Sequence, residues 1–393
     1  MKNTTAEKKY HIETLGCQAN ERDSQSIAGI FESLGIMKAK AISEADVVVI
    51  NTCSVRQKSE DKAYGFGKEL TKLKKSGKTP FVIMSGCLVG STKGERVRFQ
   101  FSELQTRVPW VSVFISPTEI RELPNILLKN EIVENIDLGI NLKEHERAVR
   151  GESKSAFVNI ATGCDNFCTF CVVPYARGEE ISRSKEDILD EVNHLVSVGY
   201  EHITLVGQNV NSWGLSKDVK FKIRSGSDFN LPFEDLVRSV NDIEKVKKIS
   251  FISSNPFDFT TGLINALTLP KMDNYLHIAI QSGNDEVLKR MNRRHTVEEF
   301  RKLITLIRKS KPELAIGTDI IVGFPGETRE QFLDTAKLVE WAKFRVAYIA
   351  MYSARKGTVA EKFFKDDVER EEKKWRHAYL TKVFDENKST FKW

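Results

Sequence analysis

The feature that most constrains this chain is its regular alternation of short β-rich apolar runs with segments of helical periodicity. In the first part of the chain the runs are "YHIETLGC", "DVVVINTC" and "FVIMSGC". Strands that alternate with helices predict a parallel sheet, because each helix returns the chain to the start of the next strand. The predicted fold class is therefore α/β, and the predicted amino-terminal domain is a doubly wound parallel sheet.

After a polar stretch around residue 150 the alternation resumes with a longer rhythm. Six strand candidates follow, at residues 157–161, 202–206, 248–252, 275–279, 315–322 and 345–352. The clearest helical segments between them lie at residues 185–197, 297–309 and 329–342. Six β-α units predict a partial (β/α)6 barrel that is open on one side. We predict an amino-terminal domain over residues 1–148, the barrel over 149–355, and a charged helical tail over 356–393.

Composition excludes some classes of protein. The 393 residues carry 60 Lys and Arg against 54 Asp and Glu, and a net charge of +6 on this length is no argument for nucleic acid. No stretch has the roughly 18 consecutive apolar residues of a membrane-spanning helix, and the amino terminus has no apolar signal region. We therefore expect a cytoplasmic protein without a membrane partner. Six cysteines in such a protein favour metal or redox chemistry over a disulfide framework.

Half of the cysteines lie in residues 164–171, which we call the cysteine loop and which follows the first predicted barrel strand. Cys164, Cys168 and Cys171 have the spacing C-x3-C-x2-C. A closed zinc site needs a fourth ligand, and the neighbouring sequence has no unused Cys or His for it. Three thiolates in one short loop suit a 4Fe-4S cluster with one iron open to a ligand from outside the protein. The alternative is three structural cysteines or a zinc loop.

The other cysteines, Cys17, Cys53 and Cys87, each follow a predicted strand of the amino-terminal sheet. We call them the dispersed cysteines, and they are about 35 residues apart. Loops at the carboxyl ends of parallel strands converge on one crevice, so the three thiols can meet there. The alternative is that each is a small buried residue that fills the sheet.

At this point the motifs resemble a known family. The cysteine loop, with Phe170 before its last cysteine and at the mouth of a six-unit barrel, resembles the radical S-adenosylmethionine (SAM) superfamily. Within that superfamily the chain resembles the methylthiotransferases over about residues 10–360. The motifs that carry this resemblance are "CVVPYARGEEISR", "LVGQNVNSWG", "IQSGNDEVLKRMNRRHT" and "TDIIVGFPGET". The resemblance is greatest to the branch that makes 2-methylthio-N(6)-dimethylallyladenosine in tRNA, rather than to the branch that modifies a ribosomal protein aspartate.

The resemblance implies two 4Fe-4S clusters and SAM as cofactors. The cysteine loop would hold the cluster that cleaves SAM, and the dispersed cysteines would hold an auxiliary cluster that carries the sulfur. The implied activity adds a methylthio group to C2 of N(6)-isopentenyladenosine next to the anticodon. That C-H bond is unactivated, so a cofactor must carry the chemistry. The implied partners are the tRNA anticodon stem-loop and an electron donor such as flavodoxin or ferredoxin, and we expect a monomer.

Further site residues are expected at the carboxyl ends of barrel strands, where barrel enzymes keep their functional groups. The expected SAM-binding residues are Phe170 near the adenine, and Gln208, Asn209, Ser253, Ser254, Gln281 and Glu327. For Glu327, in "GFPGET", the alternative is a tight turn in which glycines serve the backbone. Glu179 and Glu180 fit either a solvated acidic turn or a catalytic role.

Substrate contacts are expected from basic and aromatic residues. The run "LKRMNRRH", with Lys289, Arg290, Arg293, Arg294 and His295, could grip RNA phosphates or form a solvated helix end. Tyr175 and Trp213 are candidates to stack an extruded adenine. The charged tail has no strand-rich pattern, so the small β-barrel RNA-binding (TRAM) domain with which the family ends is not expected.

Two departures leave other functions open. Asn255 stands where the family more often has His, and "YSARKGTVAEK" lacks the prolines usual in the family. One alternative is a methylthiotransferase for threonylcarbamoyl-adenosine in tRNA or for a ribosomal protein aspartate. An alternative of another class is a non-catalytic iron-sulfur protein that binds RNA or transfers electrons, which would not cleave SAM.

Overall fold

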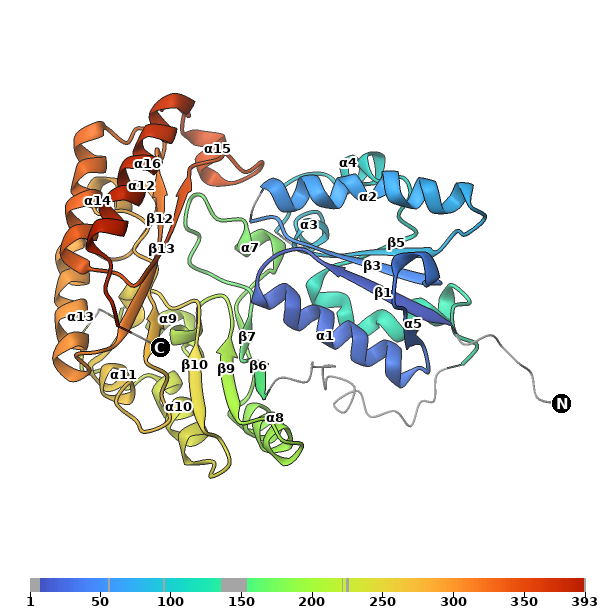
Figure 1. The fold of residues 1–393 in the computed structure, drawn as a ribbon, viewed down its shortest axis with the longest axis horizontal. Coiled ribbons are helices and arrows are strands. Elements are labelled where there is room, and N and C mark those ends of the chain that lie inside the picture. The colour runs from blue at the N-terminus through green and yellow to red at the C-terminus, as the bar shows by residue number, and fades with distance from the viewer. Residues whose placement is uncertain are drawn as a thin grey trace. The chain divides into compact units, whose positions relative to one another are not determined.

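The computed structural model describes residues 8–55, 57–94, 96–135, 154–220, 222–223 and 226–391. The chain forms two units (Figure 1). The first comprises Met1–Glu152 and Val172–Glu179, and the second comprises Ser153–Cys171 and Glu180–Trp393. The predicted boundary at residue 148 lies outside the described residues. The sequence did not predict that Val172–Glu179, which lie within the predicted barrel range, belong to the first unit.

The first unit is built on a parallel sheet of five strands in the order β2-β1-β3-β4-β5. Its elements are β1 (Lys9–Thr14), α1 (Gln18–Ser33), β2 (Met37–Lys38), η1 (Ile42–Glu44), β3 (Val47–Thr52), α2 (Gln57–Lys75), β4 (Phe81–Gly86), α3 (Cys87–Gly90), α4 (Phe101–Arg107), β5 (Val113–Ile115), η2 (Pro117–Glu122), α5 (Leu123–Lys129) and α7 (Val173–Ala176). The central strand β3 is buried along its whole length, as expected for a strand covered on both faces.

Alternate residues of β3 enter two separate apolar cores. Val47 and Val49 pack with the apolar residues of α1 and α5, among them Phe31. Val48 and Ile50 pack with Ala63 and other residues of α2 on the opposite face. Figure 1 shows α1 and α5 on one side of this sheet and α2 on the other. The prediction of a doubly wound parallel sheet is confirmed.

Six strands of the second unit form two parallel sheets, β10-β9-β6 and β11-β12-β13, and the short strands β7 and β8 form a separate antiparallel pair. Its elements are β6 (Ser155–Asn159), β7 (Ala161–Thr162), β8 (Ile181–Ser182), α8 (Lys185–Ser197), β9 (His202–Val206), η3 (Val210–Ser212), α9 (Lys217–Lys220), α10 (Pro232–Asp242), β10 (Lys248–Phe251), η4 (Pro256–Asp258), α11 (Thr261–Ala266), β11 (Tyr275–His277), α12 (Asp285–Arg290), α13 (Val297–Ser310), β12 (Ala315–Val322), α14 (Arg329–Ala342), β13 (Val346–Met351), α15 (Val359–Phe363) and α16 (Arg370–Asn387).

Isolated bridges connect the two sheets of the second unit. Ile249 is bridged to Met272, and Ser254 to Ile278, so the strands that neighbour one another in sequence also neighbour one another in space. One apolar core lies between the strands and the helices α8, α10, α11, α13 and α14. This is the predicted partial (β/α)6 arrangement. Its helices begin at local signals, since the side chains of Ser184, Thr296 and Thr328 each cap the following helix.

The segment predicted as a charged tail is part of the second unit. Its helix α16 packs against α14 and β13, and Figure 1 shows it beside α14. Among the described residues, no helix is both long enough and apolar enough to cross a membrane.

Candidate functional site

The cysteine loop follows β6 and β7 at the carboxyl end of the first barrel strand. Cys164 is buried, whereas Cys168 and Cys171 are partly exposed. The Cys171 N–H donates to the Cys168 carbonyl oxygen at 2.9 Å, which closes a tight turn. Thr169 fixes this turn, because its N–H donates to the Met291 carbonyl at 3.1 Å and its hydroxyl donates to the Arg290 carbonyl at 2.9 Å. The loop is therefore held in place from its own unit.

Polar side chains reach the sulfurs of the cysteine loop. The Asn166 side-chain amide donates to Cys164 Sγ at 3.5 Å, and Arg293 Nη1 donates to Cys168 Sγ at 3.4 Å. The other terminal nitrogen of Arg293 donates to the Ala279 carbonyl at 2.7 Å. Donors aimed at sulfur stabilise a negative charge there, as a thiolate or a metal-bound sulfur requires.

The residues of the loop fit an iron-sulfur cluster. Burial, together with the carboxylate of Glu180, raises the pKa of the Cys164 thiol to about 12, so a metal rather than bulk base must displace its proton. Across the described ranges, no three His, Cys, Asp or Glu side chains lie close enough to share one metal ion. Thiolates that hold a cubane each bind a different iron and lie farther apart than ligands of a single ion.

Three non-glycine residues near the mouth of the barrel have left-handed backbone conformations. Phe167 has φ 48°, Ser253 has φ 69° and Gln281 has φ 72°. Such conformations are costly for residues with a side chain and concentrate at functional sites. Ser253 and Gln281 follow β10 and β11, so the structure places both predicted residues at the carboxyl ends of the strands. Ser254 points elsewhere, because its hydroxyl donates to the His277 carbonyl at 2.5 Å and joins the two sheets.

Asn209 belongs to a buried polar network rather than to an open surface. Its amide donates to Ser212 Oγ at 2.7 Å and to Asp258 Oδ2 at 3.1 Å. Its side-chain oxygen accepts from Asn255 at 2.8 Å. Burial raises the pKa of Asp258, and the positive charge of Arg294 opposes that rise. Asn209 therefore holds the loops after β9 and β10 together, whereas the neighbouring Gln208 is only partly buried.

Glu180 extends this network. Its carboxylate pairs with Lys220 at 2.5 Å and accepts from the Ser212 hydroxyl at 2.6 Å. Both partners are buried, so the alternative of a solvated acidic turn is wrong for Glu180, although Glu179 is exposed. The Glu180 carboxylate raises the pKa of the Cys164 thiol, and the Lys220 ammonium lowers it.

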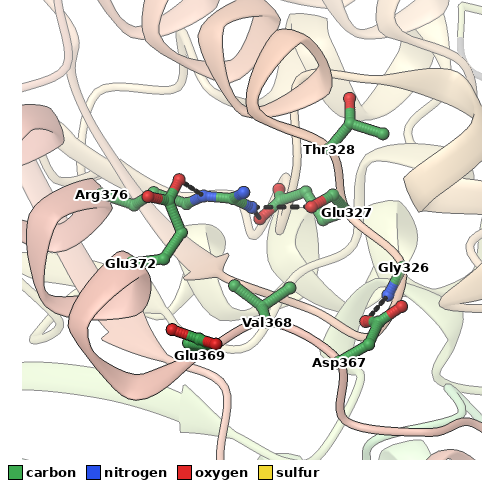
Figure 2. A pocket seen from close by; sticks show the side chains of 8 residues that line it. All are labelled: Gly326, Glu327, Thr328, Asp367, Val368, Glu369, Glu372 and Arg376. Atoms are coloured by element: carbon green, nitrogen blue, oxygen red, sulfur yellow. Dashed lines mark hydrogen bonds and ion pairs between the residues drawn. The ribbon is translucent and has the colours of Figure 1, made fainter.

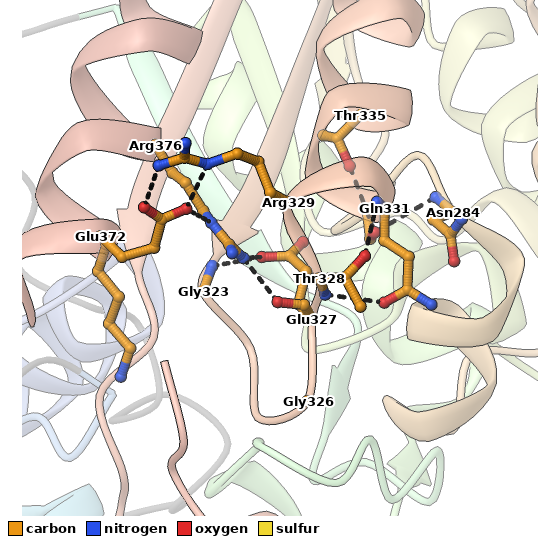
Figure 3. A network of polar contacts seen from close by, with 12 residues as sticks. Asn284, Gly323, Gly326, Glu327, Thr328, Arg329, Gln331, Thr335, Glu372 and Arg376 are labelled. Carbon is orange, nitrogen blue, oxygen red and sulfur yellow. Dashed lines mark hydrogen bonds and ion pairs between the residues drawn. The ribbon is translucent and has the colours of Figure 1, made fainter. Parts of the chain in front are cut away.

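Glu327 is buried in a network that anchors α16 (Figure 3). Its carboxylate accepts from the Gly323 N–H at 2.6 Å and from Arg376 Nη1 at 2.9 Å. Gly323 and Gly326 have φ 69° and 73°, which a tight turn requires. These contacts favour the turn interpretation of "GFPGET" over SAM binding by Glu327. The phenyl ring of Phe170 lies near this turn, edge to face with Phe324 at 6.4 Å between ring centroids.

An open hollow of about 330 Å³ lies beside the same turn (Figure 2). Its lining is rich in carboxylates, and Glu327, Glu372 and Arg376 are already joined to one another. It is lined by Gly326, Glu327, Thr328, Asp367, Val368, Glu369, Glu372 and Arg376. Because its one positive charge is used by Glu327 and Glu372, the hollow offers no site for the carboxylate of SAM.

Of the expected RNA-contacting residues, Lys289 is exposed and Arg290 is partly buried, whereas others point into the protein. Arg293 contacts the cysteine loop, and Arg294 pairs with Asp258 at 3.2 Å. His295 is 5% exposed. Trp213 is part of the barrel core, and its indole N–H donates to the Arg183 carbonyl at 3.0 Å, so it cannot stack a base. Neither predicted alternative describes Arg293, Arg294 and His295, because these residues support the mouth of the barrel from within, whereas the exposed Lys289 lies in the last turn of α12, as in the alternative of a solvated helix end.

The structure brings the loops of the dispersed cysteines together in the first unit. Cys17 precedes α1, Cys53 follows β3, and Cys87 begins α3 directly after β4. A Cβ on Gly16 would lie 2.8 Å from the Cys53 Cβ, so a glycine is required where the first two loops touch. The thiols of Cys17 and Cys87 are close enough to act electrostatically on one another.

Arg177 is a residue of this second thiol site that the sequence did not reveal. Its side chain is 5% exposed and pairs with Asp23 at 2.6 Å. Burial raises the pKa of the Cys87 thiol, and the charge and hydrogen bond of Arg177 oppose that rise. In the sequence Arg177 is one charged residue in "YARGEE", without a spacing or period that links it to Cys87.

Comparisons with known proteins extend over both units. The profile described as Radical SAM superfamily matches residues 158–339, and Uncharacterized protein family UPF0004 matches residues 9–106. The tRNA-2-methylthio-N(6)-dimethylallyladenosine synthase of Thermotoga petrophila is 41% identical over 374 residues, which cover 95% of this chain and 80% of that protein. The enzyme of the same name from Thermoanaerobacter sp. is 39% identical over 359 residues, which cover 89% of this chain and 72% of that protein.

A solved structure has a similar fold at low sequence identity. It is a radical S-adenosylmethionine methyltransferase from Kitasatospora setae, with a TM-score of 0.63 and 12% identity, and the match covers 91% of this chain and 75% of that one. At this identity the likeness concerns the fold alone.

Proposed function

Because the chain belongs to the radical SAM methylthiotransferase family, we propose that it adds a methylthio group to C2 of N(6)-isopentenyladenosine next to the anticodon of tRNA. The family implies SAM and a 4Fe-4S cluster as cofactors. We propose the cysteine loop as the ligand set of that cluster, and the dispersed cysteines as the ligand set of a second, auxiliary cluster.

The observation that carries this proposal is the division of the cysteines between the two units. Each unit carries three cysteines in loops at the carboxyl ends of parallel strands, and each set has one arginine that acts on one of its sulfurs, Arg293 in the second unit and Arg177 in the first. A SAM-bound cluster supplies one-electron cleavage of SAM, and an auxiliary cluster supplies sulfur. A protein that only transfers electrons or binds RNA has no need for the strained residues Ser253 and Gln281 at the barrel mouth.

The chain's own residues have separate tasks in this proposal. Phe170 would cover the adenine of SAM, while Ser253 and Gln281 would present polar groups to it from the ends of β10 and β11. Arg293 and Thr169 hold the cysteine loop in one conformation. The network of Asn209 fixes the loops around this mouth, which keeps water out of a site where a radical would otherwise be quenched.

The test is anaerobic reconstitution with iron and sulfide, followed by SAM, a reductant and tRNA that bears N(6)-isopentenyladenosine. Mass spectrometry of the digested tRNA should detect the 2-methylthio nucleoside. The matched control is the same tRNA with unmodified adenosine, which should not react. Product on tRNA with threonylcarbamoyl-adenosine, or on a ribosomal protein aspartate, would replace the proposed substrate with another of the same family. Failure to cleave SAM in any combination would contradict the enzyme itself.

The remaining expectations concern the setting of the reaction. We propose a cytoplasmic monomer that receives its electrons from flavodoxin or ferredoxin. Analytical ultracentrifugation and a reduction assay with each donor test these two points.

A further inference from the structure

We infer that Arg177 is a positioning residue of the auxiliary cluster, whose buried positive charge offsets the negative charge of the sulfur ligands and raises the reduction potential of that cluster. This inference rests on the proposed function, since it takes the dispersed cysteines as cluster ligands. It assigns a role to a residue outside both thiol sets.

The position of Arg177 follows from a close helix contact within the first unit. A Cβ on Gly90 would lie 1.9 Å from the Ala176 carbonyl oxygen, so only glycine lets α7 lie against α3 here. α3 begins at Cys87, and Arg177 directly follows α7. The contact between these short helices therefore brings the guanidinium to the thiol at the start of α3.

The orientation of Arg177 is fixed by Asp23. Arg177 Nη2 donates to Asp23 Oδ2 at 2.6 Å, and the two side chains are 5% and 16% exposed. A guanidinium has five N–H donors, so one carboxylate on one side leaves donors directed at other acceptors. Of the two charges, the arginine is the more deeply buried, and its positive charge opposes the rise that burial causes in the pKa of the Cys87 thiol.

The physical consequence concerns the charge of the cluster. Hydrogen bonds to sulfur, net charge and solvent exposure set the potential of an iron-sulfur cluster. Reduction adds a negative charge, and a buried cation nearby stabilises the reduced form more than the oxidised form. Lysine in place of Arg177 keeps the charge but loses the planar set of donors.

The experiment uses the full chain with all three cysteines of the cysteine loop changed to Ala, so that the dispersed cysteines can bind the only cluster. An anaerobic redox titration followed by electron paramagnetic resonance measures its midpoint potential. We expect Arg177→Gln to lower the potential and change the oxidised-to-reduced ratio at a fixed potential at least tenfold, which is about 59 mV for one electron. We expect Arg177→Lys to retain most of the wild-type value.

Two controls separate an effect on the cluster from an effect on the fold. Arg98→Gln removes another buried arginine of the first unit, one that pairs with Glu60 at 3.7 Å, and should leave the potential unchanged. If Arg177→Gln alone fails to fold, the double variant Asp23→Asn/Arg177→Gln is compared with Asp23→Asn, which keeps the cation, and the double variant should have the lower potential of the two. The second control carries Ala at the dispersed cysteines, and there Arg177→Gln should not alter the remaining cluster.

The outcomes distinguish this inference from the function on which it rests. An unchanged potential in Arg177→Gln, or equal potentials in Asp23→Asn and in the double variant, at normal iron content would overturn the role of Arg177 and leave the proposed function intact. If the chain without the cysteine-loop thiols assembles no cluster even with Arg177 in place, the dispersed cysteines are not cluster ligands and the proposed function fails first.

Discussion

The ion pair between Glu327 and Arg376 allows a strong test of how the carboxyl-terminal helix is held (Figure 3). The two side chains are 1% and 4% exposed and lie 2.9 Å apart. Arg376 also donates to the Glu327 backbone carbonyl at 2.9 Å and to Glu372 at 2.9 Å. The change Arg376→Met keeps an apolar stem of similar length and removes all three interactions, so Glu327 becomes a buried carboxylate without its cation.

The expected cost is large because the pair is deeply buried. Removing one partner of a buried ion pair typically destabilises a protein by about 3–5 kcal/mol. Burial already raises the pKa of Glu327 above the ordinary value of 4.5, and the charge of Arg376 opposes that rise. Without Arg376 the pKa rises further, and a carboxyl group with a raised pKa in the folded state stabilises less as the pH increases through that pKa. The cost of Arg376→Met should therefore grow as the pH rises from 4.5 toward neutrality.

Amide hydrogen exchange measured by mass spectrometry is the suitable assay, because it reports on α16 separately from the rest of the chain. If α16 detaches as a unit, its protected amides should exchange roughly two to four orders of magnitude faster, at about 1.4 kcal/mol per tenfold. Lys374→Met is the matched control on the same helix, since Lys374 and its partner Glu371 are 50% and 79% exposed. The reasoning is refuted if α16 exchanges at the wild-type rate in Arg376→Met, or if adding Glu327→Gln does not restore protection.

Three further predictions follow from the site. Alanine at any cysteine of the cysteine loop should abolish formation of deoxyadenosine from SAM, whereas alanine at any dispersed cysteine should spare some SAM cleavage but stop methylthio transfer; chromatography of the products would show equal losses if this division were wrong. Gly86→Ala places a Cβ 2.3 Å from the Thr52 carbonyl oxygen at φ 93°. The free energy of unfolding measured in urea should therefore fall by about 1–3 kcal/mol, and the first unit should bind less iron. Trp213→Phe should lower the free energy of unfolding by roughly 1–3 kcal/mol, because it leaves the Arg183 carbonyl unpaired. The affinity for tRNA should stay unchanged, whereas loss of a base-stacking residue would weaken binding by about 1–3 kcal/mol.

The strand and helix pattern of this chain could be predicted because it is written in local periodicity. The predicted helix at residues 185–197 coincides with α8, and the predicted helix at 329–342 coincides with α14. The placement of each dispersed cysteine at the carboxyl end of a parallel strand was also predictable, since it depends only on the order of strands and helices in the sequence. Both inferences use short-range patterns together with one general rule of sheet topology.

The partners of individual charged residues could not be predicted, because they are distant in the sequence. Arg293 contacts Cys168, which is 125 residues away, and Arg376 contacts Glu327, which is 49 residues away. A run such as "LKRMNRRH" has the same composition whether its side chains face solvent, RNA or a buried loop. The direction of each side chain is decided by the turn after α12, where Asn292 has φ 55° and its amide donates to the Phe167 carbonyl at 3.1 Å.

The two buried arginines beside sulfur explain why charge patterns mislead in a chain of this kind. A cluster with thiolate ligands is an anion, and an anion in a water-poor site needs compensating donors and positive charge. Arginine suits this task better than lysine, because it keeps its proton when buried and directs several donors in one plane. Arg177 and Arg293 each lie in a different segment of the chain from the cysteine on which they act. A basic residue near a cysteine motif should therefore be tested as a sulfur partner before it is assigned to nucleic acid.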